Sequence, residues 1–259
     1  MPKPIRIFAA LLCCLLAGMQ GSAAFPSVTV MSDKSINNAI IAIARNYSLE
    51  NNTVVNTAFT TPDVQQQQIM DGSAADIVIT PQEEWIEELK TLGLVDVYSK
   101  TEIASNRLAL VTSANNTLTA TLANGFPTAD IIRSMDWQPA FVIGNPQTQM
   151  EGIYAKQALR SMNVASDLEE FTLYIRRYDE MLEAIAQRDA FGIFFYTSVR
   201  NKKDIRVIDF FPEDTYDPVR YYAVVIAGDN MNEARKFLNY LTQKDARRTL
   251  LGYGFVINQ

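Results

Sequence analysis

The regular alternation of short apolar stretches with segments of helical periodicity is the feature that most restricts how this chain folds. The stretch SVTVMS alternates as a β-strand, and the following segment places Ile36, Ala39, Ile40 and Ile43 at helical spacing. The same pairing of strand and helix recurs in TVVNTAF with PDVQQQQIMDG, in ADIVIT with PQEEWIEELKTLG, and in PAFVIGNP with EGIYAKQALRSM. This order predicts an α/β protein whose sheets are mostly parallel and carry helices on both faces.

The N-terminus has the layout of a cleavable signal peptide. Lys3 and Arg6 precede an apolar run over residues 7–17, and the small residues Ser22, Ala23 and Ala24 follow. The run is too short to anchor the chain across a bilayer. We therefore predict that residues 1–24 are removed after export and that the protein works in the periplasm.

Composition excludes several classes of function. Both cysteines, Cys13 and Cys14, lie in the predicted signal peptide, so the remaining chain contains no disulfide. The sequence has no histidine, which removes the commonest general base and the commonest metal ligand. Its net charge of −6 argues against a nucleic-acid partner. We expect a protein that is not an enzyme, has no cofactor and no metal site, and is monomeric.

Five stretches, in this order, resemble the periplasmic molybdate-binding proteins of ABC importers: VTVMSDKSINNAI, DGSAADIVITPQEEW, IGNPQTQMEGIYAKQAL, FGIFFYTS and YLTQKDARRTLLGYGFVI. The resemblance implies a type II periplasmic binding protein fold, with two lobes and a ligand cleft between them. With crossings near Asn106 and Tyr221, we expect residues 25–106 and 222–259 to form lobe one and residues 107–221 to form lobe two.

The resemblance also implies that neutral donors, namely hydroxyls and backbone N–H groups, hold the oxyanion. The first family serine corresponds to Ser35, which has the alternative role of capping the next helix through its hydroxyl. Lys34 places a charge in a wall that is normally neutral. The second family serine falls on Pro62, and Thr61 replaces it only after a shift of one residue; Thr61 is equally suited to cap a helix that begins at Pro62.

In the second lobe, the resemblance implies a backbone N–H from Glu151, another near Tyr178, and a tyrosine hydroxyl after the strand GIFFY. Direct counting places that hydroxyl on Phe195, and Tyr196 lies one residue later on the opposite face of the strand. A β-bulge would turn Tyr196 to the cleft; without one, Phe195 faces the ligand. Tyr178 would narrow the pocket or stack on an organic ligand.

Glu151 leaves two interpretations open. Its carboxylate either points to solvent beside its own helix N-terminus, or faces the cleft with Asp33 or Asp63 and selects a neutral or cationic solute. The resemblance implies a solute-binding protein that closes on molybdate or tungstate and delivers it to an ABC permease in the inner membrane. The alternatives are a binding protein of this fold with a neutral, cationic or organic ligand, and a surface or adhesion protein without a transport role.

Overall fold

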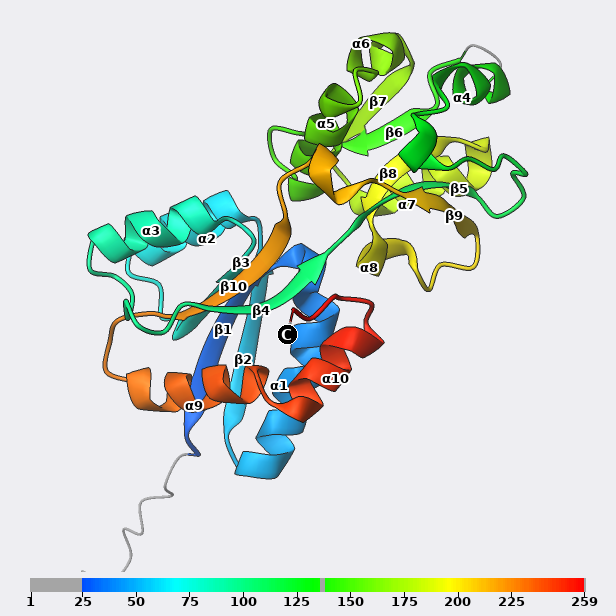
Figure 1. The fold of residues 1–259 in the computed structure, drawn as a ribbon. Helices are drawn as coiled ribbons and strands as arrows, with labels where there is room; N and C mark the ends of the chain where they lie inside the picture. Colours follow the sequence, from blue (N-terminus) through cyan, green and yellow to red (C-terminus); the bar gives the residue numbers. More distant parts are fainter. Residues whose placement is uncertain (1–24, 136–137, 259) are drawn as a thin grey trace, which may run out of the picture.

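Two five-stranded sheets flanked by helices make up the described part of the protein (Figure 1). The structure is a computed structural model and describes residues 25–135 and 138–258, so the predicted signal peptide lies outside the described residues. The predicted α/β class is confirmed. Within the described part, no helix is long and apolar enough to cross a membrane.

The first sheet is ordered β2-β1-β3-β10-β4. Strands β1, β2 and β3 are parallel, and β10 is antiparallel to both β3 and β4. The strands are β1 (Ser27–Asp33), β2 (Val54–Thr60), β3 (Ile77–Thr80), β4 (Thr101–Asn106) and β10 (Val219–Val225).

The alternation along β1 explains why helices cover both faces of this sheet. Val28 and Val30 lie in a core cluster that includes buried residues of α1 and α9, whereas Met31 packs with Ile69 and Trp85 of α2 and α3. In Figure 1, α2 and α3 lie on one side of the sheet and α1, α9 and α10 on the other. These helices are α1 (Asn37–Asn51), α2 (Pro62–Met70), α3 (Glu83–Thr91), α9 (Met231–Leu241) and α10 (Lys244–Gly252).

The second sheet is ordered β7-β6-β8-β5-β9. Strand β6 is parallel to β7 and β8, and β5 is antiparallel to β8 and β9. Its strands are β5 (Leu108–Ser113), β6 (Phe141–Gly144), β7 (Thr172–Ile175), β8 (Phe191–Phe195) and β9 (Ile205–Phe210). Its helices are α4 (Thr128–Ser134), α5 (Met150–Ser161), α6 (Ala165–Leu168), α7 (Tyr178–Arg188) and α8 (Tyr196–Val199).

Among the residues that the structure describes, four short 3₁₀ helices lie between these elements: η1 (Lys34–Ile36), η2 (Leu122–Asn124), η3 (Glu169–Phe171) and η4 (Glu213–Thr215). Of these, η1 matters most for the site, because it follows β1 directly and precedes α1. The predicted break of the C-terminal helix near Lys244 is confirmed, since α9 ends at Leu241 and α10 begins at Lys244.

The chain passes between the two sheets twice. Arg107 alone separates β4 from β5, and residues 211–218 separate β9 from β10. We call each sheet with its helices a lobe; the whole of β10, including Tyr221, belongs to the first sheet. The carboxyl ends of β1 and β2 in one sheet and of β6, β7 and β8 in the other lead into the loops that line a common cleft, which is where open α/β sheets bind ligands.

Candidate functional site

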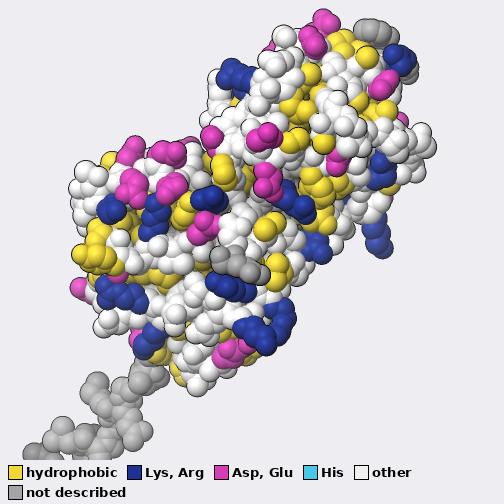
Figure 2. Space-filling model, viewed as in Figure 1, with side chains coloured by type: hydrophobic (Ala, Val, Ile, Leu, Met, Phe, Trp, Pro, Cys, Tyr) yellow, Lys and Arg dark blue, Asp and Glu magenta, His cyan; other side chains and the backbone are white. Residues whose placement is uncertain are grey.

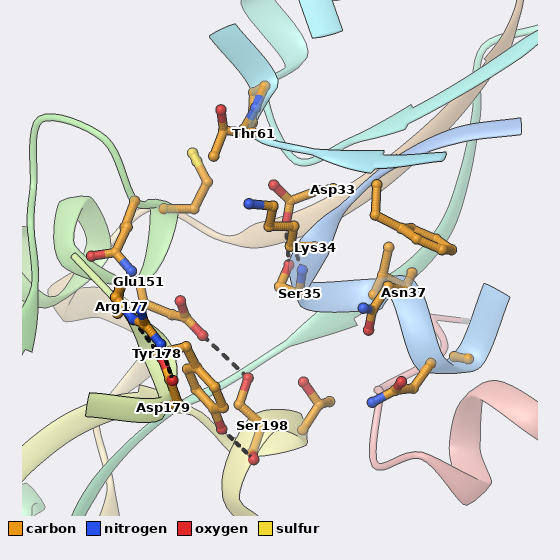
Figure 3. A pocket seen from close by; sticks show the side chains of 18 of the residues that line it. Asp33, Lys34, Ser35, Asn37, Thr61, Glu151, Arg177, Tyr178, Asp179 and Ser198 are labelled. Carbon is orange, nitrogen blue, oxygen red and sulfur yellow. Dashed lines mark hydrogen bonds and ion pairs between the residues drawn. The ribbon is translucent and has the colours of Figure 1, made fainter. Parts of the chain in front are cut away.

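A cleft of about 750 Å³ lies between elements of the two lobes. Its walls include residues 33–39, 59 and 61–62 of the first lobe, and residues 148–151, 176–179 and 197–198 of the second. On the face shown in Figure 2, acidic and basic side chains lie close together where the lobes meet. Of the predicted site residues, Lys34, Ser35, Thr61, Glu151 and Tyr178 all line this cleft (Figure 3).

The first-lobe wall is held by a chain of hydrogen bonds that ends on Asp33. Asp33 is 4% exposed, and its Oδ1 accepts from the backbone N–H of Ser35, at 2.8 Å, and from the Ser35 hydroxyl. The Ser35 and Tyr221 hydroxyl oxygens lie 2.6 Å apart. Because the single hydroxyl proton of Ser35 goes to Asp33, Tyr221 is the donor of that bond.

Asn106 extends this chain to the second lobe. Its Nδ2 donates to the Tyr221 hydroxyl at 3.5 Å and to Thr197 Oγ1 at 2.8 Å. Burial raises the pKa of Asp33, while the hydrogen bonds from Ser35 act against that rise. The alternative role of Ser35 as a helix cap is wrong: Asp33 caps η1 through Ser35 N–H, and α1 begins at Asn37 without a side-chain cap.

Glu151 faces the cleft, which decides between the two directions left open by the sequence (Figure 3). Its Oε1 accepts a hydrogen bond of 3.1 Å from the Ser198 hydroxyl. Burial and, secondarily, the negative charge of Asp33 raise the pKa of Glu151 to about 7, and the bond from Ser198 opposes this rise. The carboxyl group therefore changes charge near neutral pH.

The start of α5 is fixed by close backbone contact. A Cβ atom on Gly152 would overlap the carbonyl oxygen of Gly144, so only glycine lets the first turn of α5 rest on the end of β6. The Asn145 N–H donates to the Gln149 side chain at 2.7 Å across the same turn. This packing places Glu151 at the edge of the cleft.

Tyr178 is the first residue of α7, and its side chain contacts other residues of the second lobe. Its hydroxyl donates to the carbonyl oxygen of Ser198 at 2.5 Å, and its ring meets Phe194 edge-on at 5.9 Å. Burial first, and then the charge of Glu151, raise its pKa above the ordinary value. Tyr178 thus positions the segment that carries Ser198.

Phe195 and Tyr196 do not line the cleft. Strand β8 ends at Phe195, which is wholly buried with its ring 5.9 Å from that of Tyr154. Tyr196 begins α8 and packs edge-on against Phe210 at 5.1 Å. The following residues, Thr197 and Ser198, line the cleft instead, and the tyrosine hydroxyl nearest Ser35 comes from Tyr221. From the sequence, Tyr221 is predicted only to lie near a crossing between the lobes, and no local pattern indicates that its hydroxyl reaches Ser35.

Threonine and basic side chains are among the other polar groups of the cleft. Thr61 stands before α2 with no capping hydrogen bond from its hydroxyl, and Pro62 is the first helical residue as expected. Lys34, Arg176 and Lys202 line the cleft, and none of them forms an ion pair within the described residues. The described residues contain no group of three or more His, Cys, Asp or Glu side chains suited to a metal ion.

The chain matches one family model and named molybdate-binding proteins over most of its length. The family model described as bacterial extracellular solute-binding protein matches residues 28–256. The chain is 26% identical over 264 residues to the molybdate-binding protein ModA of Haemophilus influenzae, covering 98% of this chain and 99% of that protein. For the Escherichia coli protein of the same name, the identity is 25% over 236 residues, covering 89% of each chain.

A solved structure shares the fold. The periplasmic molybdate-binding protein of Azotobacter vinelandii superimposes with a TM-score of 0.72 at 17% identity. The match covers 90% of this chain and 100% of that protein. At this identity the likeness concerns the fold alone.

Proposed function

The chain belongs to the bacterial extracellular solute-binding protein family, and we propose that its solute is molybdate or tungstate, which it delivers to an ABC permease. The family is one of binding proteins and not of enzymes. The named molybdate-binding relatives, which match nearly the whole chain, support this ligand. Export by the predicted signal peptide and action in the periplasm are part of the proposal.

The observation that carries the proposal is the meeting of three helix N-termini at the cleft. Helices α2, α5 and α7 begin at Pro62, Met150 and Tyr178, and within the described residues none has a side-chain capping bond at its N-cap. Their first N–H groups lack intrahelical partners, and the helix dipoles favour negative charge there. Such termini bind oxyanions without a counter-cation.

Closure of the lobes would complete the site. The walls come from different sheets, so a small oxyanion contacts both only when the lobes approach one another. Arg107 and residues 211–218, the two connections between the sheets, are the natural hinge. The ligand stabilises the closed state because only that state offers all its donors, and a permease can recognise that state.

A second candidate, a neutral or cationic solute, is favoured by the inward direction of Glu151. At about 5 Å and an effective dielectric near 20, an ionised carboxylate would repel a dianion by about 7 kcal/mol. Asp33 adds a second carboxyl group to the same cleft. A solute with hydrogen-bond donors or a positive charge would interact favourably with both groups.

Thermal unfolding of the exported chain, freed of ligand, separates these candidates. A ligand at a hundred times its Kd adds about 2.7 kcal/mol to the free energy of unfolding. We expect molybdate and tungstate at millimolar concentration and about pH 6 to raise Tm by several degrees, and sulfate and phosphate to raise it less. A rise with small amines or polyols and none with the oxyanions would favour the second candidate.

A further inference from the structure

Two carboxyl groups, one from each lobe, face the same cleft. Asp33 ends β1 in the first lobe, and Glu151 lies in the first turn of α5 in the second (Figure 3). They are close enough for the charge of Asp33 to raise the pKa of Glu151. Any anion that enters between the lobes therefore meets carboxyl groups on both sides.

The two groups differ in how well their negative charge is stabilised. Asp33 accepts two hydrogen bonds from Ser35 and has Lys34 beside it, and all three interactions favour the charged form. Glu151 accepts one hydrogen bond, from Ser198, on Oε1. Its Oε2 has no hydrogen bond among the described residues. Burial raises the pKa of both carboxyl groups, but more interactions oppose that rise at Asp33 than at Glu151, so Glu151 is the group that holds a proton entering the cleft.

Other charged or titratable groups around Glu151 do not neutralise it by direct pairing. Arg177 pairs with Asp179 at 2.5 Å and with Glu180 at 3.2 Å. None of the described basic residues forms an ion pair with Glu151. The groups that face it or share its cleft are Asp33, Lys34, Tyr221 and Tyr253 of the first lobe, and Arg176, Arg177, Tyr178, Asp179 and Lys202 of the second.

We propose that this cleft binds a tetrahedral oxyanion together with one proton, which is held on Glu151 and donated from Oε2 to an oxygen of the ligand. The inference rests on the proposed function and deepens it. A neutral carboxyl group removes the repulsion of an ionised one and adds a hydrogen-bond donor. Molybdate is fully deprotonated at neutral pH, so the proton comes from solvent. Glu151 thereby makes the affinity for the oxyanion depend on pH.

Calorimetric titration with sodium molybdate between about pH 5.5 and pH 9 tests this. In the wild type we expect a constant Kd below about pH 7 and a weakening of about tenfold per pH unit above it, because free Glu151 must take up one proton. Glu151→Gln should bind with an affinity that does not change with pH and equals the wild type's acid limit, since the amide also donates. Glu170→Gln, an exposed residue of η3 outside the cleft, is the matched control and should follow the wild type.

A second measurement does not depend on any variant. Titration of the wild type near pH 8.5 in two buffers of different ionisation enthalpy should report an uptake of about one proton for each molybdate bound. Tight molybdate binding with the same Kd across this pH range and no proton uptake would overturn the inference and leave the proposed function intact. Failure of the wild type and of Glu151→Gln to bind molybdate or tungstate at any pH would overturn the proposed function, and the inference with it.

Discussion

The two walls of the cleft use their polar groups in opposite ways. On the first-lobe wall, the donors from Asn106, Tyr221 and Ser35 run in one direction to Asp33, whose Oδ1 accepts two hydrogen bonds from Ser35. On the second-lobe wall, Glu151 receives a single hydrogen bond from Ser198. Donors of the protein therefore stabilise the charge of Asp33 more than that of Glu151, whose protonation a ligand can change.

The largest effect is expected where the second wall is anchored. In Gly152→Ala, the new Cβ atom overlaps the Gly144 carbonyl and forces the start of α5 away from β6. We expect the free energy of unfolding to fall by about 3 kcal/mol, at the upper end for overpacking. Urea unfolding would measure this loss. A loss below about 0.5 kcal/mol would mean that α5 is not held by this contact.

The second largest effect is a gain in stability, expected when the Glu151 carboxyl group is replaced. The raised pKa of Glu151 means that the folded protein binds its proton more tightly than the unfolded chain does, so wild-type stability falls as pH rises from about 4.5 to 7. Glu151→Gln should therefore raise the free energy of unfolding by about 2 kcal/mol at pH 8, after allowance for the partial exposure of the side chain.

The same variant provides its own control at low pH. Near pH 4.5 the wild-type carboxyl group is neutral in the folded state, so the two proteins should unfold at nearly the same denaturant concentration. Urea titrations at both pH values would measure the difference. An equal stability of the two proteins at pH 8 would contradict the unfavourable charge assigned to the second wall.

A smaller loss of stability is expected from a substitution in the first-lobe wall. Tyr221→Phe removes the hydroxyl that donates to Ser35 and accepts from Asn106 in a fully buried setting. We expect the free energy of unfolding to fall by about 1 to 2 kcal/mol, because one acceptor and one donor lose a partner. A lower Tm of the variant in calorimetry would show this loss of stability. A gain in stability would mean that this hydrogen-bond chain does not hold the wall together.

The smallest effect is expected at the rim of the cleft. Arg177 and Asp179 form an ion pair with side chains that are 67% and 68% exposed. Such pairs are screened by water and salt, so Arg177→Ala should leave Tm unchanged within error. A clear drop in Tm, abolished by high salt, would show that the rim contributes to the second wall.

Much of the fold could be predicted because its signals are local. Strand and helix alternate with the period of each element, Pro62 opens α2, and α10 begins at Lys244 where a break was expected. The position of a strand end is less well defined by sequence. From the sequence, either Phe195 or Tyr196 could be the side chain that faces the cleft. In the structure, Phe195 packs against Tyr154 in the core, and this contact fixes where the strand ends.

The chemistry of the cleft could be predicted only in part. Ser35, Thr61, Glu151 and Tyr178 do reach the cleft, because each follows the carboxyl end of a strand. The bond between Ser35 and Tyr221 joins residues 186 positions apart, and no local pattern indicates it. Likewise, the direction of Glu151 depends on Ser198 and on the way α5 rests on β6, both of which are tertiary contacts.

The most direct test of the central claim is a crystal structure of the exported chain grown with molybdate at about pH 6. Anomalous scattering from molybdenum would locate the ion without ambiguity. We expect one site between the lobes, with Ser35 on one side and Glu151 with the start of α5 on the other. Density for molybdenum elsewhere on the surface, with the cleft empty in crystals soaked at millimolar concentration, would contradict it.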